Sequence, residues 1–375
     1  MKIVLTGGGT GGHFYPLIAI AEKLNQLTDE RKVLSFKMYY FSDAPYDKSA
    51  LFDNGLEFRS IPAGKLRLYF SIQNFFDIFK TATGILKAII ELYNIYPDVV
   101  VAKGGYASFP TLFAARILRI PVIIHESDSI PGRVNKWAGK FAARIAVSYA
   151  ETGEYFPKNK VAHTGQPIRG ELIKAAPEGA FEYLDMDSSL PVLFIVGGSQ
   201  GAEIINNIVI DILPKLVEKY QIIHQTGIAN FESNTSRANF LLSDSLFKTR
   251  YKPFAFLNPI AMKMAAGAST LIISRAGSMI FEIASWGVPT ILIPITNSNG
   301  DHQRKNAYNY ARAGGGIVIE ESHFDGAILQ FEIEQLLNAP ERLQEMKKSA
   351  LVFAKGDAAR TIADEIISIA LEHEK

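Results

Sequence analysis

The stretch KIVLTGGGTGGH occupies residues 2–13, and the related stretch VLFIVGGSQGA follows at residues 192–202. In each of them a short apolar run leads into a glycine-rich turn, and a helical pattern comes next. A buried parallel strand that ends in such a turn presents backbone N–H groups to an anionic or polyhydroxylated ligand. Two turns of this kind predict two halves with a nucleotide-binding fold in one chain.

Apolar, strand-like runs alternate with amphipathic helical patterns along the chain. These runs are Ile3–Leu5, Phe36–Phe41, Val99–Ala102, Val122–His125, Val192–Val196, Ile222–Gln225, Leu271–Ile273, Thr290–Ile293 and Gly316–Ile319. Such alternation predicts an α/β fold with parallel sheets whose ligands bind beyond the carboxyl ends of the strands. We expect domains at residues 1–164 and 165–355, and related folds suggest that the final helix, within 356–375, returns to the first domain.

The composition fits a globular chain of 375 residues, with 48% apolar and 21% charged residues. That length favours two domains. A net charge of +1 argues against bulk nucleic-acid binding, and the lack of cysteine excludes disulfides, thiolate metal sites and a cysteine nucleophile. The first apolar run is too short for a secretory signal, so we expect a cytoplasmic location. The uncharged stretch 283–300 is broken by Gly287, Pro289 and Pro294, which predicts a helix end, a turn and a buried strand instead of a membrane span.

The glycine turns alone do not identify the ligand. A dinucleotide site places an acidic residue about 20 residues beyond its turn. The carboxylate after the next strand-like run here is Asp43, which is too far along the chain. This spacing disfavours dinucleotide binding, and glycines between a strand and a helix can also serve tight packing alone.

Further motifs follow in a definite order. They are KGGYASFP (103–110), HESDSIPG (125–132) with Asn135 and Lys136, GQPIR (165–169), SRAGS (274–278) with Glu282, and DHQ (301–303) with Asn306 and Ala307. Together with the two glycine turns they closely resemble the N-acetylglucosaminyltransferases that form lipid II in peptidoglycan synthesis, the MurG family, from residue 1 to about residue 320. The resemblance implies an inverting glycosyltransferase of the GT-B architecture, with two Rossmann-like parallel-sheet domains that face a cleft.

The resemblance implies that the donor, UDP-N-acetylglucosamine, binds mainly to the second domain. The turn around Ser199 would meet the diphosphate at a helix N-terminus, Glu282 would accept hydrogen bonds from the ribose, and Gln303 would contact the sugar. The implied donor contacts are Thr10, Gly11, Gly12, Asp128, Arg169, Ser199, Gln200, Gly201, Leu257, Gly277, Ser278, Met279, Glu282 and Gln303. Taken singly, such residues also serve as helix caps, surface ion pairs or solvated helix residues.

The first domain would hold the acceptor, lipid I. The resemblance implies that its pyrophosphate lies on Gly11, Gly12, Gly104, Gly105 and Tyr106. The acceptor's C4 hydroxyl would displace UDP with inversion, a step that requires a base on the alcohol and stabilisation of the departing charge.

His13 is the leading candidate for the base, because an imidazole titrates near neutral pH. The pair His125-Glu126 is the rival, and Asp128 completes the candidate catalytic set. The sequence shows no metal-binding cluster of Asp and His, so we expect no cofactor and no obligatory metal.

The chain departs from the family pattern at three places. Its loop 126–128 reads Glu-Ser-Asp where the family usually has Glu-Gln-Asn, so an amide is replaced by a carboxylate that only accepts hydrogen bonds when ionised. The stretch 275–282 is one residue shorter, and 107–110 lacks a more usual glycine. These departures put details of the acceptor site and the identity of the base in doubt, while the activity class survives.

A candidate membrane surface lies between the first and second motifs. It consists of Leu66, Arg67, Tyr69, Phe70, Phe75, Phe76 and Phe79. Cations next to apolar side chains favour binding to anionic lipid, although aromatics at helical spacing are more often core. We expect peripheral attachment at the cytoplasmic face of the plasma membrane, with cell-wall synthesis proteins as further candidate partners.

Two other functions remain open. One is a different GT-B enzyme, such as a diacylglycerol glycosyltransferase, which would share the nucleotide loops. The other is a UDP-N-acetylglucosamine epimerase, which has the same two-domain form and no need for a lipid surface.

Overall fold

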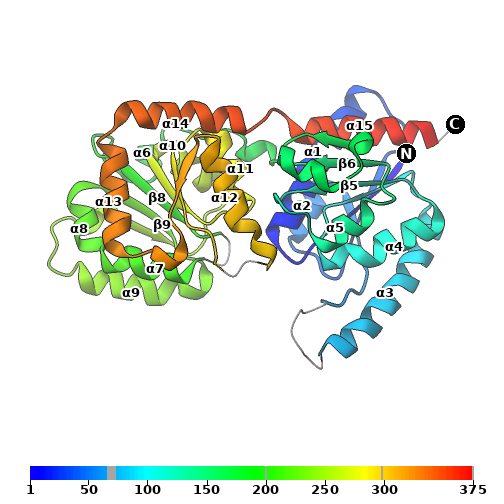
Figure 1. Cartoon of the computed structure of the whole chain (residues 1–375), viewed down its shortest axis with the longest axis horizontal. Helices are drawn as coiled ribbons and strands as arrows, with labels where there is room; N and C mark the ends of the chain where they lie inside the picture. The colour runs from blue at the N-terminus through cyan, green and yellow to red at the C-terminus, as the bar shows by residue number, and fades with distance from the viewer. Residues whose placement is uncertain (66–72, 199–200, 297–298, 374–375) are drawn as a thin grey trace. The chain divides into compact units, whose positions relative to one another are not determined.

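The computed structural model describes residues 1–65, 73–198, 201–296 and 299–373. Its contacts divide the chain into two compact units, which we treat separately (Figure 1). The first unit comprises Met1–Gly170 and Lys355–Lys375, and the second comprises Glu171–Ala354. The segment 165–170, which was expected to open the second domain, therefore makes its contacts within the first unit.

The first unit contains a seven-stranded parallel sheet with the order β3-β2-β1-β4-β5-β6-β7. Its strands are β1 (Lys2–Thr6), β2 (Lys37–Ser42), β3 (Leu56–Ser60), β4 (Val99–Ala102), β5 (Val122–Glu126), β6 (Arg144–Val147) and β7 (Val161–His163). Its helices are α1 (Gly11–Glu30), α2 (Lys48–Asp53), α3 (Gln73–Ile95), α4 (Phe109–Leu118), α5 (Arg133–Ala138) and α15 (Ala358–His373).

Both faces of this sheet are covered by helices. Because side chains alternate along a strand, Ile3 and Leu5 pack with α1 and α15, whereas Val4 packs with α3 and α4. Helices α1 and α15 lie side by side, although they come from opposite ends of the chain (Figure 1). Strand β1 lies between β2 and β4, so the loops that follow β1, β4 and β5 emerge at one edge of the sheet.

The second unit repeats this plan with a six-stranded parallel sheet in the order β10-β9-β8-β11-β12-β13. Its strands are β8 (Val192–Val196), β9 (Gln221–Gln225), β10 (Tyr251–Phe254), β11 (Leu271–Ser274), β12 (Thr290–Leu292) and β13 (Gly316–Val318). Its helices are α6 (Ala180–Tyr183), α7 (Glu203–Asp211), α8 (Leu213–Lys219), α9 (Phe231–Leu241), α10 (Pro259–Ala268), α11 (Met279–Trp286), α12 (His302–Arg312), α13 (Gly326–Leu337) and α14 (Pro340–Phe353).

All nine predicted strands are present, and the predicted α/β class is confirmed. Four strands of the described chain were not predicted from the sequence, namely β3, β6, β7 and β10. Strands β3, β7 and β10 lie at sheet edges, where one side needs no partner and charged residues or proline are tolerated, as with Pro253 in β10. In the described part of the stretch 283–300, helix α11 ends, Gly287 is left-handed and strand β12 follows, as expected. Among the described ranges, no helix is long and apolar enough to cross a membrane.

Candidate active site

The first glycine turn joins β1 to α1 and requires backbone conformations that favour glycine. Gly9 has a φ of 86°, and a β-carbon on it would stand 2.9 Å from the Tyr106 ring. The Tyr40 hydroxyl donates to the Gly7 carbonyl at 2.8 Å, which ties the turn to β2. The turn is therefore in contact with Tyr106 and Tyr40. Gly11 and Gly12, which follow it, form the start of α1.

His13 lies in the first turn of α1, next to the loop that follows β4. Its Nδ1 lies 2.9 Å from the Thr10 hydroxyl, and its Nε2 would stand 3.5 Å from a β-carbon placed on Gly105. When the Nδ1–H donates to Thr10, Nε2 carries the lone pair that a general base needs. The structure thus brings His13 and Gly105 together, as the predicted acceptor site requires.

The loop after β4 contains two consecutive glycines with positive φ, 87° at Gly104 and 78° at Gly105. The Tyr106 hydroxyl donates to Asp43 at 2.9 Å. Burial and this hydrogen bond to the carboxylate raise the pKa of Tyr106 to about 12. Tyr106 therefore remains a neutral phenol whose hydroxyl proton is bonded to Asp43. The predicted contact between Tyr106 and the acceptor would use atoms other than this proton.

The loop after β5 is organised by Glu126, which is 4% exposed. Its carboxylate accepts hydrogen bonds from the backbone N–H of Asp128 at 3.0 Å, the backbone N–H of Gly132 at 2.9 Å and the Asn135 amide at 3.0 Å. Burial, followed by the charge of Asp128, raises the pKa of Glu126. This geometry suits a side chain that holds the loop, and the role of Glu126 as base stays a prediction.

His125 is completely buried, and its Nε2 lies 3.0 Å from the Gly165 carbonyl. Burial lowers the pKa of His125 well below its ordinary value, and the charge of Lys103 lowers it further. His125 is thus a neutral imidazole inside the protein. Among the histidines of these loops, His13 has the setting that fits a base better.

The predicted donor residues that the structure describes in the second unit lie in two loops, at Gly201 and Leu257, and at the N-termini of two helices, α11 and α12. Gly201 has a φ of 79°, and a β-carbon there would overlap the Thr226 carbonyl. Gly277, Ser278, Met279 and Glu282 lie at the start of α11, where backbone N–H groups favour an anionic ligand. Ser199 and Gln200 lie outside the described residues.

Two predicted donor residues already have partners within the second unit. The Leu257 N–H donates to the Gln225 side chain at 3.0 Å, so a contact between Leu257 and the base would use its carbonyl. The Gln303 carbonyl oxygen accepts from the Ile295 N–H at 3.3 Å, so a hydrogen bond that Gln303 donates to a sugar would come from its amide NH₂ group.

Arg169 belongs to the first unit, and its guanidinium lies over the Tyr15 ring at 4.0 Å from the ring centre. The next residue, Gly170, donates to Glu22 of α1 at 2.9 Å. The predicted role of Arg169 near the nucleotide stays a prediction, and α1 is the element that positions it.

The predicted membrane residues that the structure describes are exposed on α3. Phe75 is 60%, Phe76 66% and Phe79 58% exposed, and the Phe75 and Phe79 rings lie 5.0 Å apart. They are therefore not core residues. Leu66, Arg67, Tyr69 and Phe70 lie outside the described residues.

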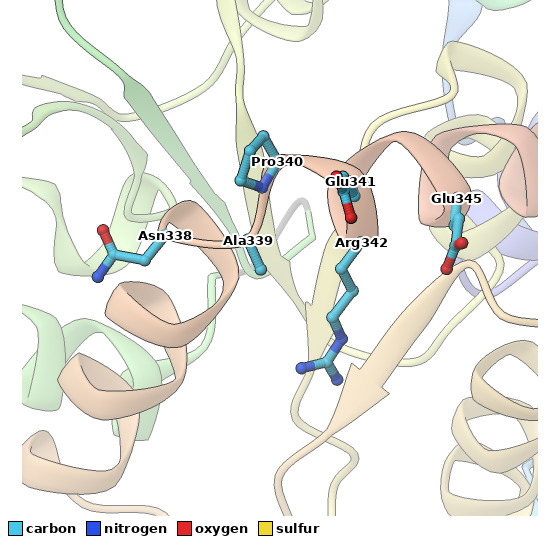
Figure 2. Close-up of a pocket in the computed structure, with 6 residues that line it drawn as sticks. All are labelled: Asn338, Ala339, Pro340, Glu341, Arg342 and Glu345. Carbon is cyan, nitrogen blue, oxygen red and sulfur yellow. The ribbon is translucent and has the colours of Figure 1, made fainter.

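One hollow within the second unit has no connection with the predicted chemistry. It has a volume of about 650 Å³ and lies at the turn between α13 and α14, where Asn338 and Arg342 line it (Figure 2). None of the predicted site residues lines it. In the described part of the chain, no group of three or more Asp, Glu or His side chains is arranged to hold a metal ion.

A change at Gln303 tests the donor site. We expect Gln303→Ala to raise KM for UDP-N-acetylglucosamine about 3- to 10-fold, since one hydrogen bond contributes about 0.5–1.5 kcal/mol. Steady-state kinetics at saturating acceptor measure this effect. The matched variant Gln303→Glu keeps the acceptor for the Ile295 N–H and removes the donors, so it should weaken donor binding too. Unchanged donor kinetics in both variants would remove Gln303 from the site.

Two family models match the chain. The glycosyltransferase family 28 N-terminal domain matches residues 3–147, and the C-terminal domain of that family matches residues 192–366. One relative is a Treponema denticola protein named UDP-N-acetylglucosamine--N-acetylmuramyl-(pentapeptide) pyrophosphoryl-undecaprenol N-acetylglucosamine transferase. It is 37% identical over an alignment of 377 positions, which covers 96% of each chain. A Clostridium novyi protein of the same name is 34% identical and covers 100% of this chain and 99% of its own.

Solved structures show the same fold. A crystal structure of Acinetobacter baumannii MurG matches with a TM-score of 0.74 at 24% identity and covers 98% of this chain and 99% of its own. A UDP-GlcNAc 2-epimerase from Neisseria meningitidis, bound to UDP-GlcNAc, matches with a TM-score of 0.67 at 16% identity, covering 98% and 100%. Identities this low establish the fold alone and do not discriminate between transferase and epimerase chemistry.

Proposed function

Because the chain belongs to glycosyltransferase family 28, and within it to the UDP-N-acetylglucosamine--N-acetylmuramyl-(pentapeptide) pyrophosphoryl-undecaprenol N-acetylglucosamine transferases, we propose that it forms lipid II. The donor would be UDP-N-acetylglucosamine, and the acceptor would be the C4 hydroxyl of the N-acetylmuramyl group of lipid I. The observation that carries the proposal is the convergence, at one sheet edge, of the turn with His13, the Gly104-Gly105 loop and the loop held by Glu126.

The reaction is a single displacement. His13 Nε2 takes the proton of the C4 hydroxyl while that oxygen forms a bond to the anomeric carbon of N-acetylglucosamine. The bond from this carbon to the β-phosphate oxygen breaks, the configuration inverts, and UDP leaves with the electron pair. Thr10 supports this role, because its hydroxyl oxygen can accept from Nδ1–H and so keep Nε2 basic.

The charge that develops on the leaving diphosphate needs stabilisation. Backbone N–H groups at the start of α7 and at the start of α11 are suited to this role, because helix N-termini favour negative charge. We therefore propose that no metal ion is obligatory and no cofactor is used. Transfer that persists in excess chelator would support this proposal, and loss of transfer that returns with Mg²⁺ would overturn it.

An acceptor panel tests the proposed reaction against its alternatives. The protein is incubated with labelled UDP-N-acetylglucosamine alone, with a short-chain lipid I analogue, or with diacylglycerol. Transfer only to the lipid I analogue supports the proposal. Transfer to diacylglycerol would support another glycosyltransferase, and a 2-epimer formed from the donor alone would support the epimerase.

We propose further that the exposed aromatics of α3 attach the protein to an anionic membrane surface, at the cytoplasmic face where a lipid-linked acceptor is presented. Lys80 and Lys87 are exposed on the same helix, and cations beside apolar side chains favour anionic lipid. Cell-wall synthesis proteins are further candidate partners.

Paired substitution of Phe75 and Phe79 by serine should reduce binding to vesicles that contain anionic lipid by at least about tenfold, since burial of one phenylalanine contributes about 1.5–3 kcal/mol. Co-sedimentation measures the partition coefficient. Phe240→Ser is the matched control, because Phe240 is 79% exposed on α9 of the second unit. Equal binding by all three proteins would refute membrane contact through α3.

A further inference from the structure

Lys103 directly follows β4, yet its side chain is only 2% exposed, which makes it one of the largest fully buried side chains of the protein. Burial of an ammonium group is costly unless opposite charges and hydrogen-bond acceptors surround it. Burial lowers the pKa of Lys103 to about 8, although the charges of Glu126 and Asp128 oppose this shift. Lys103 directly precedes Gly104, so its backbone leads into one of the predicted acceptor loops.

The contacts of Lys103 lead into the loop that follows β5. Its Nζ donates to the Ser127 hydroxyl, which in turn donates to the Gln166 carbonyl oxygen at 3.0 Å. Gln166 also accepts from the Ser148 hydroxyl at 2.9 Å. Ser127 lies between Glu126 and Asp128, so a buried cation is bonded to the residue between two carboxylates.

Those two carboxylates repel each other. The charge of Asp128 raises the pKa of Glu126, while the charge of Lys103 lowers it. Glu126 must accept three hydrogen bonds to keep the loop 126–132 in place, and an ionised carboxylate accepts better than a protonated one. Another titratable neighbour, His125, is buried and neutral, so it adds no charge to this group.

We propose that Lys103 is a positioning residue for the acceptor, whose buried ammonium supplies the counter-charge that lets loop 126–132 carry two carboxylates and places Asp128 against the muramyl group. This explains how the chain accommodates Asp128 where its family usually has an uncharged amide. The statement about the muramyl group rests on the proposed function, whereas the charge coupling between Lys103 and Asp128 does not.

A double-substitution cycle tests the proposal. Lys103→Met keeps most of the side-chain volume and removes the charge, Asp128→Asn removes the opposing charge, and the third variant carries both changes. Lys160→Met is the matched control, because Lys160 lies in the same unit and its Nζ donates to the Ala142 carbonyl at 2.9 Å. Each protein is assayed for KM and kcat with a lipid I analogue and with UDP-N-acetylglucosamine, and for its thermal unfolding midpoint.

We expect Lys103→Met to lower kcat/KM for the lipid I analogue about 10- to 100-fold, since a misplacement of about 1 Å has such effects, while KM for the donor stays unchanged. Adding Asp128→Asn should restore most of this loss and most of any loss in the unfolding midpoint. A double variant whose losses are the product of the single losses would overturn the proposal. If Lys103→Met does not fold, a double variant that folds supports the proposal, and one that also fails to fold overturns it.

The pH dependence gives a second readout that simple packing would not produce. In the wild-type chain, kcat/KM for the acceptor should fall as the pH rises through about 8, because the ammonium is lost there. This decline should be absent in Lys103→Met. The folded pKa is lower than that of the unfolded chain, so between about pH 8 and 10.5 the unfolded chain binds the extra proton, and the lysine's contribution to stability should improve with pH.

The cycle also separates the two claims. If the unchanged protein transfers no sugar, the proposed function fails, while the unfolding midpoints still test the charge coupling. If transfer occurs and the cycle shows no coupling, the proposal for Lys103 fails on its own.

Discussion

Replacement of His13 by alanine should lower kcat for sugar transfer by about 10²- to 10⁴-fold, the usual contribution of a general base. The physical reason is that no other described imidazole near the acceptor loops combines a basic nitrogen with a place beside Gly105, since His125 is buried and bonded to the Gly165 carbonyl. Single-turnover rates at saturating substrates measure the effect on the chemical step, free of product release.

Thr10→Val is the matched variant for this prediction. It removes the oxygen that lies 2.9 Å from His13 Nδ1 and leaves the imidazole in place, so its loss should be smaller than that of His13→Ala. The unfolding midpoint should hardly change in either variant, because this contact is exposed. A His13→Ala variant that keeps nearly full kcat would assign the base to another group, with Glu126 or Asp128 as the next candidates.

Gly104→Ala should have the second largest effect. The backbone of Gly104 has a φ of 87°, and a β-carbon there would lie 2.7 Å from the Asn135 amide nitrogen. Asn135 donates to the His125 carbonyl and to Glu126, so its displacement would disturb the loop after β5 as well. We expect a loss of about 1–3 kcal/mol in stability from the strained backbone alone, and a larger loss in kcat/KM for the acceptor than for the donor.

Gly179→Ala is the control that separates the effect of backbone strain from the effect of steric contact with neighbouring atoms. Gly179 has a φ of 71°, and no heavy atom of the described residues lies within 4 Å of its added β-carbon. It lies before α6 in the second unit, whereas the predicted acceptor loops belong to the first unit. Denaturant titration and acceptor kinetics of both variants should show strain in both and loss of acceptor use only in Gly104→Ala. Equal kinetic losses would contradict a specific role for the Gly104 loop.

Much of the fold could be predicted from the sequence, because buried parallel strands are short, almost wholly apolar runs, as at Val99–Ala102 and Val192–Val196. The edge strand Leu56–Ser60 escaped because charged residues alternate along it. The resemblance to the MurG family is confirmed by the relatives and by the two family 28 matches. Assignments at particular site residues, such as Glu282 at the ribose, stay predictions.

The contacts of the buried side chains Glu126 and Lys103 could not be predicted from the sequence. That Glu126 binds backbone N–H groups of its own loop depends on how the chain turns at Gly132, which the sequence pattern does not specify. Lys103 belongs to the KGGYASFP motif, and the family resemblance implies no role for it, although the sequence contains one signal. A lysine placed directly after a wholly apolar strand is seldom buried without a partner, and the acidic loop after the neighbouring strand provides the charges.

The most direct test of the proposed function is the transfer of labelled N-acetylglucosamine from UDP-N-acetylglucosamine to a short-chain lipid I analogue in detergent, with the linkage of the product determined by NMR. We expect one N-acetylglucosamine to be joined to the C4 oxygen of the muramyl group with inverted anomeric configuration, together with an equal amount of UDP. A protein that binds UDP-N-acetylglucosamine yet forms no such product, or that converts the donor to its epimer instead, would contradict the proposed function.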